Sequence, residues 1–228
     1  MKKILCSIII VLPFLVSKAQ DCKAYIPYEK GTVTEITNYD KKGRSIGVVT
    51  QTVTAVEHKA NNATFSVHQV FEDTQGDGET IETDVTFKCV DGTFYIDMNG
   101  YMDQKQMQAY EGMEVKVSMD EIDIPSSYKV GQQLKDGYIQ MDVSGGPIPI
   151  KMVVSIENRK VVAEEKVTTP AGTFDCVKIS QDVVTKSIMN MTISSIEWYA
   201  EGVGMVKTET IRKGKLMGYS ELTKFKKP

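Results

Sequence analysis

Hydrophobic and polar residues alternate along most of the chain from Gly31 onward. Runs rich in Val, Ile, Thr, Tyr and Phe with a period of two are typical of strands that bury one face and leave the other in water. Short sequences that favour the positive φ angles of two-residue hairpin turns separate these runs: Lys42-Gly43, Asn61-Asn62, Asp91-Gly92, Asn158-Arg159 and Lys213-Gly214. The pattern predicts an all-β antiparallel meander of about a dozen strands, near residues 31–38, 45–57, 63–73, 79–90, 93–99, 113–119, 137–143, 148–157, 160–168, 173–183, 187–199, 204–212 and 215–225.

Two segments depart from simple alternation. Asp103 to Tyr110 contains good helix formers behind a candidate N-cap, which predicts one short helix between strands. The hydrophobic parity changes at Ser194-Ser195, before Trp198, and this favours a β-bulge there. Trp198 itself is predicted to anchor the core.

The N-terminus has the organisation of a secretory signal. Lys2 and Lys3 precede an apolar stretch over residues 4–16, and Ser17 and Ala19 occupy the positions that a signal peptidase requires. The stretch is shorter than the roughly 20 residues that span a membrane. We therefore expect a signal peptide over residues 1–19 and a single exported β domain over 20–228, either periplasmic or secreted, since no Pro-, Ser- or charge-rich linker divides the chain.

The residue before the first cysteine of the expected mature chain argues against a lipid anchor. A lipidated cysteine is preceded by a small residue, whereas Asp21 precedes Cys22. The full chain has a formal net charge of −3, and the expected signal peptide removes lysines but no acid. The acidic mature chain argues against a nucleic-acid partner, which would require a concentrated basic face.

The cysteines that remain after processing are Cys22, Cys89 and Cys176. An oxidising compartment favours pairing two of them, and their wide spacing does not fit a zinc site. Cys89 shares a strand face with Val85 and Phe87, and Cys22 lies on an N-terminal segment that could reach it. We expect a Cys22–Cys89 disulfide with Cys176 unpaired, and three buried thiols are the alternative.

Histidines and acidic loops give no metal or catalytic site. If Asn61-Asn62 forms the turn, His58 and His68 project from opposite faces of the sheet and cannot share a ligand. The segment from Asp73 to Asp84 partly resembles a calcium loop, but no helices are expected on either side of it. We expect a polar hairpin loop instead.

The remaining chemistry favours binding over catalysis. The chain has no G-x-S-x-G elbow and no glycine-rich phosphate loop, and its carboxylates are scattered over strands. The sequence therefore names no catalytic residue, no metal ligand and no cofactor. Methionines cluster around the expected helix, and deformable side chains suit the wall of an apolar pocket better than a copper site; they are Met98, Met102, Met107 and Met113.

Two sequence motifs resemble those of a known protein family. TTPAGTFDCVKI over residues 168–179 and EWYAEGVGMVK over 197–207 are similar to exported domains of unknown function, including the TapB-like group. The resemblance implies a large antiparallel sheet curled into a half-barrel, the YmcC-like arrangement. It brings no catalytic residue.

Three functions agree with these features. The first is a non-catalytic binding module of the cell envelope that holds an apolar or amphipathic ligand or a partner protein. The second is an envelope hydrolase that uses some of the scattered carboxylates. The third is a structural protein that interacts through exposed strand edges.

Overall fold

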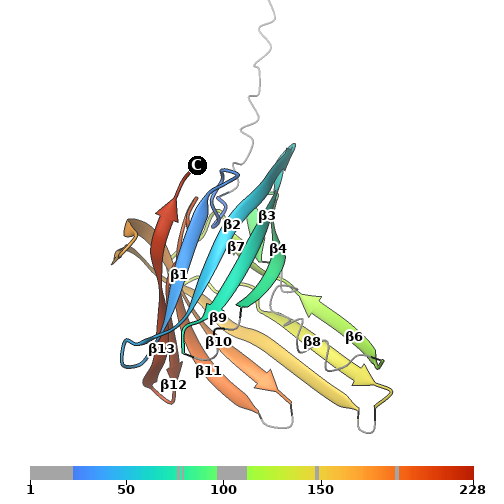
Figure 1. The fold of residues 1–228 in the computed structure, drawn as a ribbon. Coiled ribbons are helices and arrows are strands. Elements are labelled where there is room, and N and C mark those ends of the chain that lie inside the picture. Colours follow the sequence, from blue (N-terminus) through green and yellow to red (C-terminus); the bar gives the residue numbers. More distant parts are fainter. Residues whose placement is uncertain (1–22, 76–77, 79, 97–111, 147–148, 188–189) are drawn as a thin grey trace, which may run out of the picture.

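The computed structural model describes residues 23–75, 78, 80–96, 112–146, 149–187 and 190–228. The regular elements of these residues are strands, and all belong to one antiparallel sheet (Figure 1). The strands are β1 (Val33–Asp40), β2 (Ser45–Lys59), β3 (Asn62–Asp73), β4 (Thr80–Val90), β5 (Thr93–Ile96), β6 (Glu114–Asp120), β7 (Ile122–Pro125), β8 (Gly137–Ser144), β9 (Ile150–Thr169), β10 (Gly172–Lys186), β11 (Met191–Ala200), β12 (Gly204–Arg212) and β13 (Lys215–Lys226).

The sheet is two meanders joined through the chain ends. Its thirteen strands are ordered β6-β8-β9-β10-β11-β12-β13-β1-β2-β3-β4-β5-β7, so the first and last strands of the chain lie side by side. The sheet curls until β1 to β4 and β8 to β11 form opposite walls of a nearly closed barrel (Figure 1). The predicted all-β fold and its barrel-like curvature are confirmed. The helix predicted over residues 103–110 lies outside the described residues.

The seam of the barrel is spanned by one short stretch of chain. β6 and β7 are separated only by Glu121, yet β6 pairs with β8 at one edge and β7 pairs with β5 at the other. Gly137 lies against this stretch, because a Cβ atom there would come within 2.5 Å of the Ile122 side chain and 2.8 Å of the Asp120 carbonyl oxygen. A larger residue at this position would push the two edges apart.

The turn predicted at Asn158-Arg159 is wrong, because β9 continues through it. Asn158 has a φ of 57° and donates a hydrogen bond through Nδ2 to Asp182 Oδ2 at 2.9 Å. The register with β10 shifts between Ser180 and Asp182, so the residue with positive φ forms a β-bulge rather than a hairpin turn. The side chain of Arg159 is buried at 1% exposure as a result.

The predicted bulge at Ser194-Ser195 is also wrong. Both residues keep a regular register with β10, and the shift in β11 lies between Trp198 and Tyr199 on the side of β12. Trp198 is buried at 5% exposure, as expected, but it packs in a small cluster on the face opposite to Tyr199. β7 was not predicted, since a four-residue strand that ends in proline gives almost no periodic signal.

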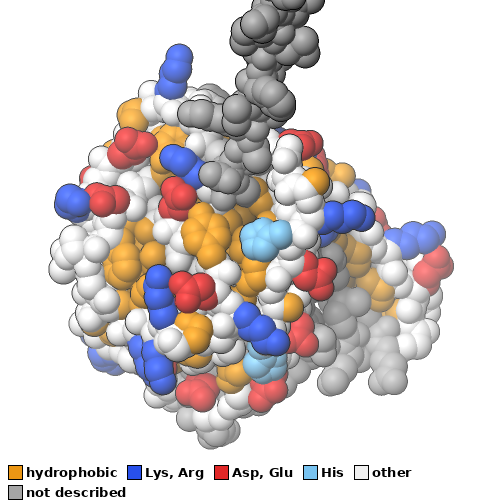
Figure 2. Space-filling model, turned by 90° about the horizontal axis from the view of Figure 1, so that it is seen from above, with side chains coloured by type: hydrophobic (Ala, Val, Ile, Leu, Met, Phe, Trp, Pro, Cys, Tyr) orange, Lys and Arg blue, Asp and Glu red, His pale blue; other side chains and the backbone are white. Residues whose placement is uncertain are grey.

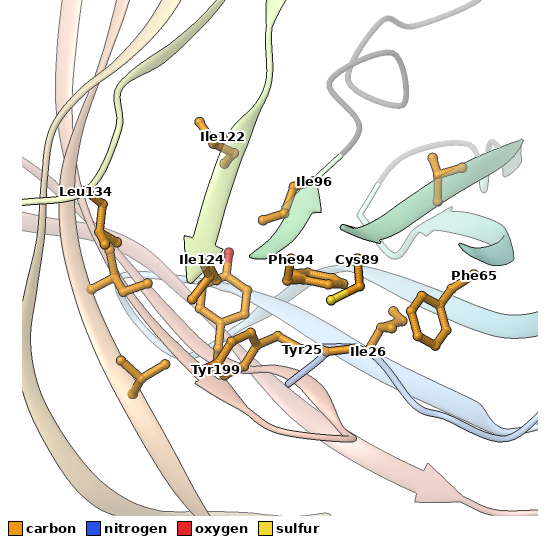
Figure 3. Close-up of a cluster of buried hydrophobic side chains, with 14 of the residues drawn as sticks. Tyr25, Ile26, Phe65, Cys89, Phe94, Ile96, Ile122, Ile124, Leu134 and Tyr199 are labelled. Atoms are coloured by element: carbon orange, nitrogen blue, oxygen red, sulfur yellow. The ribbon is translucent and has the colours of Figure 1, made fainter. Parts of the chain in front are cut away.

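The N-terminal segment fills one end of the barrel interior. Ala24, Tyr25 and Ile26 are 0–5% exposed and pack among buried side chains from both walls (Figure 3). The Ala24 carbonyl accepts a hydrogen bond from the Gly202 amide at 2.9 Å, which ties the segment to the turn between β11 and β12. The interior core is therefore built around a segment that precedes the first strand.

One described cysteine is in a disulfide and one is free. Cys89 is fully buried and disulfide-bonded, and Cys176 is a buried free thiol. The other two cysteines of the sequence, Cys6 and Cys22, lie outside the described residues. The Cys22–Cys89 pairing therefore stays a prediction.

Candidate ligand site in the barrel interior

A cavity of about 270 Å³ lies between the N-terminal segment and the wall formed by β1 to β5. Most of its lining is apolar, and no described residue that lines it carries a charge. The lining residues are Tyr25, Ile26, Ile36, Asn38, Val49, Gln51, Gln69, Val85, Phe87, Phe94, Ile96, Tyr199, Gly204 and Met205. Such a surface suits an apolar molecule with few polar groups.

A row of polar side chains crosses this wall. Thr34 pairs with Gln51, and Gln51 pairs with Gln69, so the register places all three on one face of the sheet. Thr34 Oγ1 donates to Gln51 Oε1 at 3.3 Å. Within the described part of the chain, the amide of Gln69 has no hydrogen-bond partner. The side-chain amides of Gln51 and Gln69 therefore offer hydrogen-bonding groups inside a mainly apolar cavity.

Two tyrosines separate this cavity from the end of the barrel. The rings of Tyr25 and Tyr199 meet edge to face with centroids 6.2 Å apart. Both also line a second cavity of about 690 Å³, whose other lining residues include Tyr128, Glu164 and Lys166. Figure 2 shows hydrophobic side chains gathered in the middle of this end of the molecule, with charged side chains around them. The tyrosine pair thus lies between a cavity with charged lining residues and a cavity whose lining is uncharged and mainly apolar.

Tyr25, Tyr128 and Glu164 of β9 all line this second cavity. Burial raises the pKa of Tyr25 above its ordinary value, and the neighbouring Tyr128 adds to the effect. Burial likewise raises the pKa of Tyr128. Both phenols therefore stay neutral at physiological pH.

A buried arginine fastens the seam from the inside. Arg159 donates through Nη1 to the Lys135 carbonyl at 2.6 Å and through Nη2 to the Asp123 carbonyl at 2.8 Å. Its Nε donates to Gln181 Oε1 at 3.2 Å, and the carboxylate of Asp123 lies 3.7 Å from Nη1. Burial lowers the pKa of Arg159, but a guanidinium remains charged in proteins. The side chain joins β9 and β10 to β7 and to the segment that leads into β8.

The same network extends to the tyrosine pair through Glu197. Gln181 Nε2 donates to Glu197 Oε1 at 2.8 Å, and Ser195 Oγ donates to the same oxygen at 3.1 Å. The Tyr199 hydroxyl donates to Glu197 Oε2 at 2.6 Å. Both carboxylate oxygens are therefore engaged with protein donors. This arrangement positions Tyr199 beside the cavity.

Only one of the four predicted ligand-lining methionines lies in the described residues. Met98, Met102 and Met107 lie outside them, and Met113 is half-buried just before β6. A Cβ atom on Gly146 would lie 3.1 Å from the Met113 sulfur, which places this methionine at the β8–β9 turn rather than beside the two cavities. The sequence reasoning missed Gln51 and Gln69, because it assigned polar residues of alternating strands to the wet face.

The histidines lie on opposite faces, as predicted, although the turn is one residue earlier. Ala60 has a φ of 53°, and His58 pairs with the buried Ala63. His68 lies on the other face, with Nδ1 2.9 Å from the carboxylate of Asp84. Because Asp84 is in the middle of β4, the segment that resembled a calcium loop is not one loop.

The described residues contain no group of His, Cys, Asp and Glu side chains that could hold a metal ion. They include no helix that is long and apolar enough to cross a membrane.

Comparison with known families gives a match over most of the chain. Residues 29–222 match a family model described as DUF3108-like. The chain belongs to the DUF3108-like family. A comparison with curated proteins finds no match.

Two crystal structures share the fold of this DUF3108-like chain. One is a candidate exported protein with a YmcC-like fold from Bacteroides fragilis, with 22% sequence identity and a TM-score of 0.73. The other is a candidate lipoprotein from Parabacteroides distasonis, with 26% identity and a TM-score of 0.73. Each match covers 90% of this chain and 100% of the other. The resemblance to YmcC-like domains of unknown function is confirmed, and the finer TapB-like assignment stays a prediction.

Proposed function

We propose that this DUF3108-like chain is an exported binding protein that holds an apolar or amphipathic molecule in its interior cavity. The signal-like N-terminus and the description of two structural relatives as candidates for an exported protein and a lipoprotein support an envelope location.

The observation that carries the proposal is the smaller of the two cavities lined by Tyr25, which lies against β1 to β5. Protein interiors are close-packed and rarely hold voids larger than a water molecule. The cavity of about 270 Å³ beside this core corresponds to about nine waters at ~30 Å³ each. It approaches the lower end of ligand pockets, roughly 300 Å³. Water molecules form few hydrogen bonds with an apolar wall of this kind, so a ligand with an apolar body is the favoured occupant.

The state of Glu197 weighs against the hydrolase alternative. A catalytic carboxylate needs a free oxygen facing the substrate. Glu197 is the carboxylate linked to the cavity through Tyr199, and its two oxygens accept hydrogen bonds from Gln181, Ser195 and Tyr199. It is placed to orient Tyr199 rather than to transfer a proton to a ligand.

A fluorescent probe tests the proposal. N-phenyl-1-naphthylamine, a neutral aromatic dye, should bind the purified protein with a stoichiometry of one and be displaced by decanol. Val49→Phe, which fills the cavity from its β2 wall, should weaken dye binding at least tenfold. Val48→Phe is the matched control, because Val48 is the next residue on the same strand and points to the other face.

Two results would contradict the proposal. One is absence of saturable dye binding by the folded wild-type protein. The other is equal dye affinity in the two phenylalanine variants, which would place the dye outside the cavity. Circular dichroism and thermal melting of each variant establish that it is folded before its affinity is compared.

A further inference from the structure

We infer that the ligand carries a neutral hydrogen-bonding group, which the amides of Gln51 and Gln69 hold in the middle of the cavity wall. This inference rests on the proposed function and adds the chemical class of the ligand. It follows from the charge of the lining, from the hydrogen bonds that the amides leave unused, and from the position of the amide row among apolar rows.

The lining excludes a charged group on energetic grounds. None of the described residues around the cavity has a carboxylate, ammonium or guanidinium side chain. An ionised carboxylate or ammonium group that leaves water without a partner of opposite charge meets a large desolvation cost. The buried cation nearest in the network, Arg159, already directs its donors to Lys135, Asp123 and Gln181.

The amides leave hydrogen-bonding capacity on the cavity side. Each glutamine amide offers two N–H donors and an acceptor oxygen. The Gln51 oxygen accepts from Thr34, which leaves its amino group for a ligand. Gln69 makes no side-chain hydrogen bond to any described residue, so both its oxygen and its amino group are available. No side-chain nitrogen or oxygen of the described residues is both buried and without a hydrogen-bond partner. The unpaired amide atoms of Gln51 and Gln69 are therefore exposed.

The register lets one ligand group contact both amides. Gln51 and Gln69 are directly opposite each other on β2 and β3, and side chains in such pairs have Cβ atoms about 4.5–5.5 Å apart. The next row on one side is Ile36 paired with Val49, and on the other side Val67 pairs with Val85. Apolar rows therefore lie on both sides of the amide row. A hydroxyl, ester or amide group that is attached to an aliphatic chain fits this order of surfaces.

Competition among ten-carbon compounds tests the inference. Decanol, decanamide and sodium decanoate are titrated at pH 8 against protein loaded with N-phenyl-1-naphthylamine. Decanol and decanamide should displace the dye at least tenfold more strongly than decanoate. Gln69→Met keeps the length of the side chain and removes the amide. It should lower the affinity for decanol about three- to tenfold, as the loss of one neutral hydrogen bond does.

The controls separate this inference from the proposed function. Gln133→Met changes an exposed glutamine outside the cavity and should leave every affinity unchanged. In Gln69→Met the affinity for the dye itself should stay within about twofold, because the apolar lining is intact. An unchanged dye affinity together with a lowered affinity for decanol supports the inference.

Three outcomes would overturn it. Decanoate could bind as tightly as decanol, or decanol could bind Gln69→Met as tightly as wild type; in either case the ligand cavity stands and the neutral-group assignment is wrong. If no ten-carbon compound displaces the dye and the dye does not bind, the proposed function and the inference are both wrong.

Discussion

Replacing Arg159 by methionine tests how the barrel is held closed. Methionine retains a long, flexible side chain that fills most of the same space. The change removes the hydrogen bonds to the Lys135 and Asp123 carbonyls and to the Gln181 amide. The Asp123 carbonyl belongs to the edge strand β7 and the Lys135 carbonyl to the segment before β8, so the substitution acts beside the seam.

The expected loss can be worked from these contacts. A buried polar group that loses its partner costs about 1–3 kcal/mol, and breaking a buried charged interaction costs about 3–5 kcal/mol in total. Arg159 is 1% exposed, so solvent cannot replace the lost bonds. We expect Arg159→Met to lower the free energy of unfolding by about 3–5 kcal/mol, a large share of the roughly 5–15 kcal/mol that stabilises a typical domain.

Urea unfolding followed by tryptophan fluorescence measures this loss. Trp198 is the only tryptophan of the chain and is 5% exposed, so its emission reports the folded state. Arg212→Met is the matched control, because Arg212 is exposed and makes no ion pair with another described residue. The control should change the free energy of unfolding by less than about 0.5 kcal/mol. A loss below about 1 kcal/mol in Arg159→Met, or an equal loss in both variants, would refute the proposed role of Arg159 at the seam.

Four further predictions concern processing, sulfur chemistry and pH. Envelope material should begin at Gln20 by N-terminal sequencing, and a chain that retains residue 1 would contradict the signal peptide. Non-reducing peptide mapping should join Cys22 to Cys89, and a Cys22–Cys176 peptide would exclude this pairing. Burial, followed by the nearby acids, raises the pKa of Cys176 to about 12, so a thiol reagent at pH 8 should label it far more slowly in native protein than in urea; equal rates would show that the thiol is accessible. Hydrogen bonds lower the pKa of Asp40 to about 2, and the largest contribution comes from the backbone amide of Arg44. The ionised carboxylate therefore stabilises the fold at pH values above its ordinary pKa of about 4, and this stabilisation disappears as the pH falls through 2. The thermal midpoint of Asp40→Ala should therefore lie below that of wild type at pH 7 and approach it between pH 4 and 2; a gap that does not narrow would contradict this assignment.

Most strands could be predicted from the sequence because their turns and their alternation agree. Gly43, Gly92 and Gly214 adopt positive φ angles at three of the predicted turns, as hairpins require. The same signal misled at Asn158, whose positive φ serves a bulge inside β9. A dipeptide that favours positive φ does not distinguish a hairpin turn from a bulge. The difference depends on whether a neighbouring strand pairs with the residues on both sides of the dipeptide, as β10 does at Asn158.

The interior polar groups could not be predicted from alternation. Polar residues on a strand are assigned to the wet face, yet Gln51, Gln69 and Arg159 all point into the barrel. Their positions become meaningful only when the register brings Thr34, Gln51 and Gln69 into one row and the seam places the Asp123 carbonyl beside the guanidinium. These are contacts between segments far apart in the sequence.

The residues of the candidate site could not be predicted from the sequence. A ligand site on the concave face was expected from a curled sheet with one buried face, and the structure has a mainly apolar cavity on that face. The expected lining by Met98, Met102 and Met107 lies outside the described residues, whereas Tyr25 and Tyr199 enclose the cavity that the structure describes. Tyr25 precedes the first strand, and no periodic pattern indicates that it folds into the interior.

A crystal structure of the protein grown with decanol tests the central claim most directly. The proposed function predicts one decanol molecule inside the barrel, with its chain against Phe87 and Phe94 and its hydroxyl about 3 Å from the amides of Gln51 or Gln69. A cavity filled by the protein's own side chains, or decanol bound only on the outer face of the sheet, would contradict the claim that the interior is a ligand site.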